Sequence, residues 1–337
     1  MDWSRVRKVV GRRRWYWRRR VLNGTFRGAA LLADFVVERQ AARDHIEILR
    51  DIRYGRHRTG HQLDIYRPLR PARPLPVLLY IHGGAFTLCS KDTHRSIALA
   101  NARGAGYLVF NINYRLAPAH AFPAAISDAC DAYRWVVEHC AAYGGDPSRI
   151  VLAGESAGGN LALGVAIAAT YRRPEFYARK VWALGVVPVG VMPVTPYLQA
   201  SDPARHTAAG YLALAATRAI AADYLGKRAL PDERNLMADP VRILEECGAP
   251  QRPFPPVFSG VGDRDAVCWN DVKRLEKACR RLGIPITAHY YPNEIHAFHA
   301  LQWRSASRLF WRRAFRFMKR VAQGASPRAA LRAASGA

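Results

Sequence analysis

The chain has 337 residues, of which 50% are hydrophobic. A chain of this length and composition can bury a large core, either as one α/β domain with an added cap or as two domains. The same composition excludes a chain that is disordered throughout. No run reaches the roughly 18 uninterrupted apolar residues of a membrane span. The apolar stretch of the N-terminus, residues 29–37, contains Asp34 and makes a poor signal peptide. We therefore expect a cytoplasmic protein.

The formal net charge of +25 is concentrated at the two ends of the chain. Residues 1–20 carry nine Lys or Arg and one acid, a net charge of +8, and residues 303–337 carry nine Lys or Arg and no acid, a net charge of +9. The rest of the chain therefore carries the remaining +8 of the +25. A basic fringe of this kind suggests peripheral contact with an anionic membrane through the N-terminus, although an ordinary solvated face is an equal alternative. Nucleic acid is not favoured as a partner, because no nucleic-acid-binding motif accompanies the charge.

The cysteine pattern predicts thiols in a reducing compartment and no metal site. No two cysteines are spaced as CxxC, which rules out the usual metal knuckle or redox motif. The six positions are Cys89, Cys130, Cys140, Cys247, Cys268 and Cys279.

In chain order, the elements predict a mostly parallel sheet with helices on both faces. Residues 1–50 are basic and helical and are predicted to form a cap segment. Two alternating segments, 46–53 and 62–66, are typical of paired strands. Short apolar runs, typical of strands buried on both faces, follow at Val77–Ile81, Tyr107–Ile112, Ile150–Ala153, Ala183–Val187, Val257–Val261 and Ile286–Tyr291.

Helical patterns lie between these runs. They cover residues 94–103, 123–143, 157–171, 271–282 and 303–321, and the last places Trp303 and Phe310 on one apolar face opposite arginines. Residues 195–238 are helical and polar and are predicted to be a cap insertion. The main domain is thus expected over 51–325, followed by a flexible tail over 326–337.

A serine lies between the strand Ile150–Ala153 and the next helix, in the sequence Gly154-Glu155-Ser156-Ala157-Gly158-Gly159. This is G-x-S-x-G in the strand–turn–helix context that exposes a serine hydroxyl at a strained turn. The helix N-terminus also favours developing negative charge. We predict that Ser156 is a nucleophile; the alternative is a glycine-rich turn with a chance serine.

A second glycine-containing loop, His82-Gly83-Gly84-Ala85-Phe86, follows the strand Val77–Ile81. Backbone N–H groups of Gly83 and Gly84, with that of Ala157, would form an oxyanion hole. His82 precedes the glycines and is expected to brace the loop rather than act as a base, since the order Ser…Asp…His requires a later histidine.

The acid and the base are expected after the last two strands. The strand Val257–Val261 ends in Gly262-Asp263-Arg264-Asp265, so two aspartates compete for the role of acid. After the final strand, His296 comes first in its loop and is preferred over His299 as the base. The carboxyl ends of parallel strands share one sheet edge, so both groups can reach Ser156.

With these residues in place, the chain from about Gln62 to Phe298 resembles the hormone-sensitive-lipase-type esterases of the α/β-hydrolase fold. The motifs that carry the resemblance are His82–Phe86, Asn113–Pro118 with Phe122–Ala125, Gly154–Gly159 and Ile295–Phe298, and Leu63–Pro68 also resembles the feruloyl-esterase and kynurenine-formamidase group. Asp265 is favoured over Asp263 because its spacing from Gly262 resembles the G-x-x-D turn of many α/β-hydrolases. Three departures are Ala85 in place of a third glycine, Ala119 in place of an acid, and no Asp-Pro-Leu turn.

The resemblance implies a cofactor-free carboxylesterase-type serine hydrolase that acts on a small-molecule ester through Ser156, His296 and Asp265. Short to medium acyl chains are expected, with a helical cap over the site. Two alternatives stay open: an amidase or formamidase with the same triad, and a non-catalytic hydrolase scaffold that binds lipid or nucleic acid through its basic ends. A homodimer is compatible with the sequence, which does not determine the oligomeric state.

Overall fold

The computed structural model of the chain describes residues 34–69, 74–226 and 233–324, together with positions 21, 24, 25 and 28. Residues 1–20 of the predicted cap segment and the predicted tail 326–337 lie outside the described residues. Residues 34–43 are helical and lead into the first strand. Within the described part of the chain, no helix is long and apolar enough to cross a membrane.

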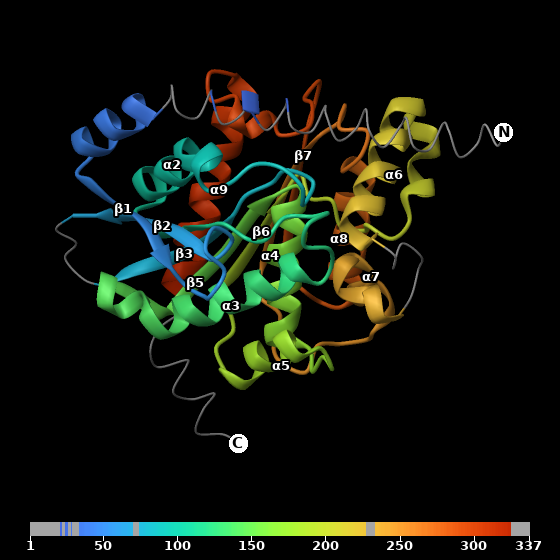
Figure 1. The fold of residues 1–337 in the computed structure, drawn as a ribbon, viewed down its shortest axis with the longest axis horizontal. Helices are drawn as coiled ribbons and strands as arrows, with labels where there is room; N and C mark the ends of the chain where they lie inside the picture. The colour runs from blue at the N-terminus through green and yellow to red at the C-terminus, as the bar shows by residue number, and fades with distance from the viewer. Residues whose placement is uncertain are drawn as a thin grey trace.

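One eight-stranded sheet forms the centre of the molecule, in the order β1-β2-β4-β3-β5-β6-β7-β8 (Figure 1). Its strands are β1 (Ile46–Arg53), β2 (Gln62–Pro68), β3 (Leu75–Ile81), β4 (Leu108–Ile112), β5 (Gly145–Glu155), β6 (Gly190–Val194), β7 (Val257–Gly262) and β8 (Ile286–Tyr291). β1 pairs antiparallel with β2, and β2 with β4; every later pair is parallel. The predicted α/β-hydrolase architecture is therefore confirmed.

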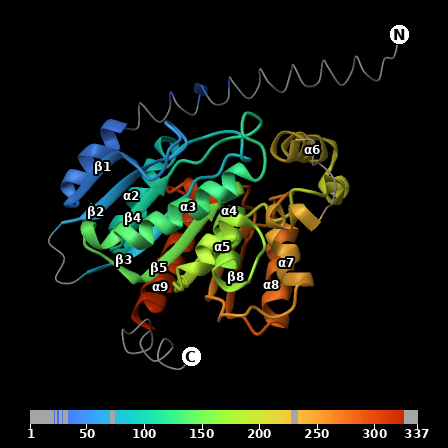
Figure 2. The ribbon, with the colours of Figure 1, turned by 60° about the horizontal axis from the view of Figure 1, so that its bottom comes forward.

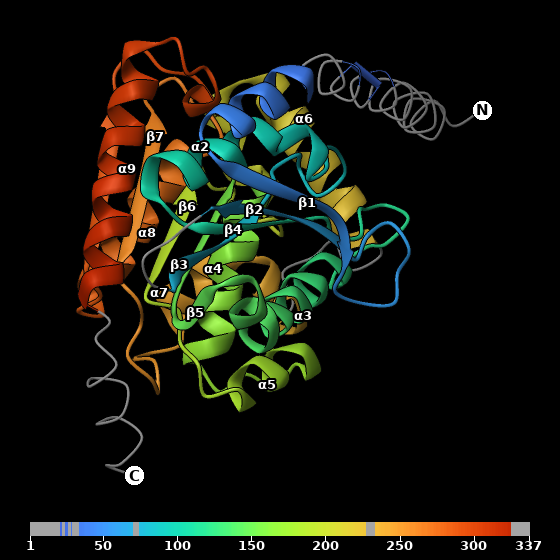
Figure 3. The same cartoon turned by 90° about the vertical axis from the view of Figure 1, so that its left-hand side faces the viewer.

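Helices cover both faces of this sheet and enclose two hydrophobic cores (Figure 3). In β3, Val77, Leu79 and Ile81 enter one core while Leu78 and Tyr80 enter the other, because successive side chains of a strand point to opposite faces. The first core lies against α3, α4, α5, α7 and α8, and the second against α2 and α9. The run Val77–Ile81 is continuously apolar because both faces of the strand are buried.

The described helices follow the predicted order. The α-helices are α2 (Arg95–Ala105), α3 (Ala124–His139), α4 (Ala157–Thr170), α5 (Phe176–Ala183), α6 (Tyr211–Leu225), α7 (Pro240–Glu246), α8 (Trp269–Arg281) and α9 (Ser305–Gly324). The 3₁₀ turns are η1 (Asp92–His94), η2 (Cys140–Tyr143), η3 (Pro203–Ala209), η5 (Glu233–Ala238) and η6 (Phe298–Ala300).

Two predicted details are wrong. The run Ala183–Val187 is not a strand: α5 ends at Ala183, Gly185 takes a positive φ of 70°, and the strand begins at Gly190. Periodicity cannot separate the two because the whole segment is apolar. Trp303 does not join the buried face of the last helix, since it precedes α9 and is 73% exposed.

The segment 195–238 lies at the end of the sheet that carries the candidate site, and Figure 2 shows α6 set apart from the layers that cover the sheet. The segment contains η3, α6 and η5 and no strand among its described residues. Tyr224 of α6 stacks on Phe86, with ring centroids 3.7 Å apart, and its carbonyl accepts a hydrogen bond from the N–H of Phe122. These contacts fix α6 above the loop that follows β3.

Candidate active site

Ser156 lies at a sharp turn between β5 and α4. Its φ of 51° and ψ of −115° are a conformation that non-glycine residues rarely adopt, at a cost of about 1–3 kcal/mol. Two hydrogen bonds hold the turn: the Ser156 N–H donates to the Val194 carbonyl at 2.9 Å, and the Ser156 carbonyl accepts from Tyr197 at 3.1 Å. The surrounding structure therefore maintains the strained conformation that a nucleophile elbow requires.

The glycines of this turn are needed because backbones approach closely there. A Cβ added to Gly158 would lie 2.1 Å from the Ile81 carbonyl oxygen, and one added to Gly154 would lie 2.4 Å from the Gly158 backbone. The elbow is thus packed directly against the end of β3. Because Ile81 pairs with Gly154 across the parallel strands, the loop after β3 begins beside the serine turn.

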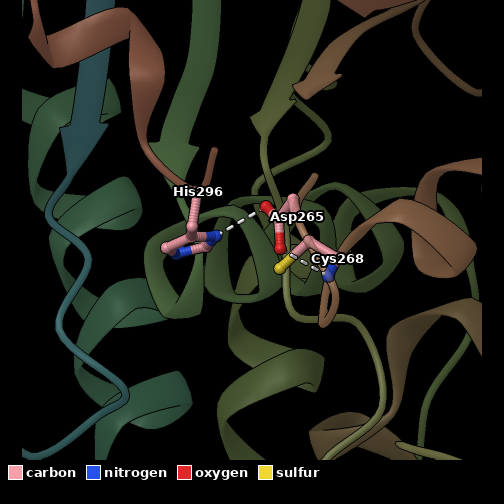
Figure 4. A group of neighbouring side chains, drawn as sticks. All are labelled: Asp265, Cys268 and His296. Carbon is pink, nitrogen blue, oxygen red and sulfur yellow. Dashed lines mark hydrogen bonds and ion pairs between the residues drawn. The ribbon is translucent and has the colours of Figure 1, made fainter. Parts of the chain in front are cut away.

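Asp265 and His296 meet at the same edge of the sheet. Asp265 follows β7 and His296 follows β8, and the Asp265 Oδ2 lies 2.7 Å from the His296 Nδ1 (Figure 4). The carboxylate is buried, and its Oδ1 accepts hydrogen bonds from the N–H groups of Val267 and Cys268 at 3.2 and 2.9 Å. The imidazole is 43% exposed, so one side of the ring is open.

The charge of Asp265 favours the protonated form of His296. Burial alone would lower the pKa of His296, but the hydrogen bond and the charge of Asp265, with a smaller effect from Glu155, raise it. A base whose imidazolium is stabilised in this way can take up a proton from a nucleophile. Since Nδ1 is engaged by Asp265, Nε2 is the nitrogen left for that proton.

The competing residues lie elsewhere. Asp263 is exposed and bonds only through its backbone N–H, to the Tyr291 carbonyl. His299 is buried against Glu155, with Nε2 and Oε2 2.8 Å apart. His82 is buried and stacked on Tyr114, and burial together with the neighbouring His94 lowers the pKa of His82 to about 3. The geometry places Asp265 beside His296 and leaves His82 to brace its loop.

The loop after β3 has the backbone conformation of a donor loop. Gly84 has a φ of 112°, and a Cβ on it would lie 2.2 Å from the Leu88 carbonyl oxygen. Ala85, which replaces the usual third glycine, has a φ of 53° and is therefore strained. Gly83 and Gly84 lie beside the serine turn, where Ala157 begins α4.

The structure brings the serine turn and the histidine loop together without joining them directly. Among the described residues no hydrogen bond links the hydroxyl of Ser156 to His296. The connection runs instead through Glu155, whose side chain contacts His299 three residues beyond His296. This carboxylate is not predictable from the sequence, because the second residue of G-x-S-x-G carries no signal of its own.

Within the part of the chain that the structure describes, Cys268 is the further group that could join Asp265 and His296 in a metal site. Asp265, Cys268 and His296 offer ligand atoms within 4.8 Å of one another (Figure 4). Burial and the nearby Asp265 raise the pKa of the Cys268 thiol well above its usual range, while a metal ligand must be a thiolate. Asp265 moreover already accepts hydrogen bonds from two backbone N–H groups and faces His296. These residues therefore fit an acid–base pair better than a metal centre.

Comparison with known proteins identifies the family of the chain. Residues 78–300 match the family described as alpha/beta hydrolase fold. The chain is 32% identical to the acetyl-hydrolase of Streptomyces hygroscopicus over 237 residues, which cover 68% of this chain and 71% of that protein. It is 44% identical to the carboxylesterase NlhH of Mycobacterium tuberculosis over 121 residues, or 34% of this chain and 38% of that protein.

Solved structures show the same fold. The hyperthermophilic esterase from Pyrobaculum calidifontis superposes with a TM-score of 0.71 at 24% identity, over 90% of this chain and 93% of that chain. The sequence match spans well under half of NlhH, whereas the family match covers most of the present chain. The chain therefore belongs to the hormone-sensitive-lipase-type family of the α/β-hydrolase fold.

Proposed function

We propose that the chain is a serine carboxylic ester hydrolase in which Ser156, His296 and Asp265 form the catalytic triad. The observation that carries the proposal is the 2.7 Å contact between Asp265 and His296 at the sheet edge where Ser156 occupies a strained strand-to-helix turn. Ser156, Asp265 and His296 follow three separate strands of one sheet, and a triad is recognised by the geometry of its members rather than by their spacing in the sequence. The esterase and acetyl-hydrolase names of the relatives support ester substrates.

The mechanism is a two-step acyl transfer. The neutral His296 takes the hydroxyl proton through Nε2 while Ser156 Oγ bonds to the ester carbonyl carbon. The N–H groups of Gly83, Gly84 and Ala157 stabilise the oxyanion, and His296 then protonates the departing alcohol. Water attacks the acyl-enzyme with the same base, releasing the acid and restoring the serine. Losing one oxyanion donor is expected to lower turnover on the order of 100-fold.

We propose short to medium acyl chains as the substrates. The contact of Tyr224 with Phe86 brings the α6 segment down onto the loop that holds the oxyanion donors. This covering helix limits the space above the site. The name of the Streptomyces relative, an acetyl-hydrolase, points to the same range of acyl chains.

The decisive measurement is hydrolysis of p-nitrophenyl acetate, butyrate and octanoate by the wild type and by Ser156→Ala. The control is Ser148→Ala, since Ser148 lies near the opposite end of the same strand. Loss of activity in the first variant alone supports the proposal and ranks the acyl lengths. Equal activity in all three proteins would exclude Ser156 as the nucleophile. An inactive wild type would favour the alternative of an amidase or formamidase that uses the same three residues on an amide substrate.

We also propose that the protein is cytoplasmic and contacts anionic membranes at its periphery through its basic N-terminus. Nine basic residues and a single acid within residues 1–20 support this contact. Among the described helices, α9 is also basic, with six Lys or Arg and no acid. All six cysteines lie in the described residues and none forms a disulfide, which supports a reducing compartment.

A further inference from the structure

A buried carboxylate lies directly behind the proposed nucleophile. Glu155 is the last residue of β5, and its side chain is only 11% exposed. Its Oε1 lies 3.2 Å from the Nε2 of His94, and its Oε2 lies 2.8 Å from the Nε2 of His299. The pKa of Glu155 is held well below its usual range, because these two histidines outweigh the opposing effect of burial. The group is therefore an anion at neutral pH.

Glu155 also supports the loop that holds the proposed oxyanion donors. A Cβ added to Gly83 would lie 2.7 Å from the Glu155 Oε1 and 2.9 Å from its Cγ, so the backbone of this loop rests on the Glu155 side chain. On the same side, the ring of His94 lies 5.6 Å from that of His82, the residue that begins the loop. One side chain thus contacts the loop after β3 and, through the next peptide, the serine turn.

The histidine loop is held from two sides at His299. The Nε2 of His299 faces Glu155, and its carbonyl oxygen accepts hydrogen bonds from Ser307 Oγ at 2.7 Å and Trp311 Nε1 at 2.9 Å, both in α9. His299 belongs to η6, which starts two residues after His296. His296 itself is 43% exposed and bonded at Nδ1, so the position of its loop depends on the held residues on either side, which are Glu294, paired with Arg304, and η6.

We infer that Glu155, acting through His299, is a positioning residue that sets the His296 loop and the oxyanion loop relative to Ser156. This inference rests on the proposed triad. Glu155 donates and accepts no proton in the reaction; it supplies fixed negative charge and a rigid contact shared by three loops. The same charge stabilises the imidazolium that His296 becomes during each acyl-transfer step.

The test compares Glu155→Gln, which keeps the shape and removes the charge, with Glu294→Gln. Glu294 is a buried acid of the same histidine loop, but its partner is Arg304 and it is not among the groups that raise the pKa of His296. We expect Glu155→Gln to lower kcat about ten- to a hundredfold with KM little changed, because it disturbs alignment rather than substrate binding. We expect Glu294→Gln to stay within about twofold of the wild type in kcat.

The pH profile separates positioning from general loosening of the fold. Catalysis needs neutral His296, so kcat/KM rises with pH through the His296 titration. Removing a charge that raises the pKa of His296 must move this acid limb to lower pH in Glu155→Gln. The limb of Glu294→Gln should not move. An unmoved limb and a kcat within twofold in folded Glu155→Gln would overturn the inference.

Substitutions at His299 provide the second arm. His299→Phe keeps the ring packing and loses Nε2, whereas His299→Gln retains an N–H donor and should recover part of the lost kcat. The double variant Glu155→Gln/His299→Phe should be no worse than the poorer single variant, since both act through one contact. Additive losses of kcat in the double variant would overturn the inference. Ser156→Ala tests the proposed triad on which this inference rests, and an active Ser156→Ala would refute that triad. If Ser156→Ala is inactive but the Glu155 and His299 variants keep wild-type kcat, this inference alone is refuted.

Discussion

Replacing Asp265 by Asn is the most informative single perturbation of this site. In the wild type the Oδ1 of Asp265 accepts hydrogen bonds from the N–H groups of Val267 and Cys268, while Oδ2 faces the Nδ1 of His296. The asparagine oxygen must remain with those two backbone donors, so its NH₂ group points at Nδ1. Nδ1 then becomes an acceptor, and the proton moves to Nε2, where it blocks removal of the serine proton.

The expected loss follows from these contacts. A hydrogen bond to a charged group contributes about 1.5–3 kcal/mol, and reversing the tautomer against a neutral hydrogen bond costs about another 1–2 kcal/mol. Together these make about 2.5–5 kcal/mol of transition-state stabilisation. Since about 1.4 kcal/mol corresponds to a factor of ten, kcat should fall about 10²–10⁴-fold. The remaining acid limb should move to lower pH, because the charge that raises the pKa of His296 is gone.

The matched control is Asp263→Asn, two residues away on the same turn. Asp263 is exposed and interacts only through its backbone N–H, so this variant should retain wild-type kcat. Both variants are assayed on p-nitrophenyl butyrate, with thermal unfolding as the check that each remains folded. A folded Asp265→Asn with full activity, or a larger loss in Asp263→Asn, would refute the assignment of the acid.

Three further outcomes are expected. Gly158→Ala should abolish esterase activity in the soluble fraction, because the added Cβ would lie 2.1 Å from a backbone carbonyl oxygen. Gly164→Ala in the same helix should stay active, because its Cβ would meet only the end of a flexible side chain at 2.7 Å. Activity in both variants would contradict the tight packing of the elbow. Lys91→Met should cost about 1.5–3 kcal/mol in urea unfolding, because it leaves the fully buried Asp64 with the Asp51 N–H and the more distant Arg95. Lys180→Met at a partly exposed pair should cost less than about 1 kcal/mol, and equal losses would count against the buried network. Deleting residues 1–20 should abolish sedimentation with anionic vesicles in low salt, and unaltered binding would disprove membrane contact through this segment.

The local parts of the site are readable in the chain because each depends on neighbouring residues. The strand, turn and helix around Ser156 are encoded by an apolar run, two small glycines and a helix of small residues. The alternation of apolar runs with helical patterns likewise implies a parallel sheet, and that places the groups after β7 and β8 at one edge. These features need no knowledge of distant contacts.

The remaining features were decided by contacts between segments far apart in the chain. Two aspartates share the turn after β7, and only the path of the chain out of β8 sets Asp265, and not Asp263, against His296. The strand after α5 starts at Gly190, where α9 packs within 3.2 Å of a Cβ position, although the preceding residues are equally apolar. Glu155 carries no sequence signal because its partners are 61 residues before it and 144 residues after it. Such pairings depend on the assembled sheet, and for that reason the tertiary structure alone could reveal them.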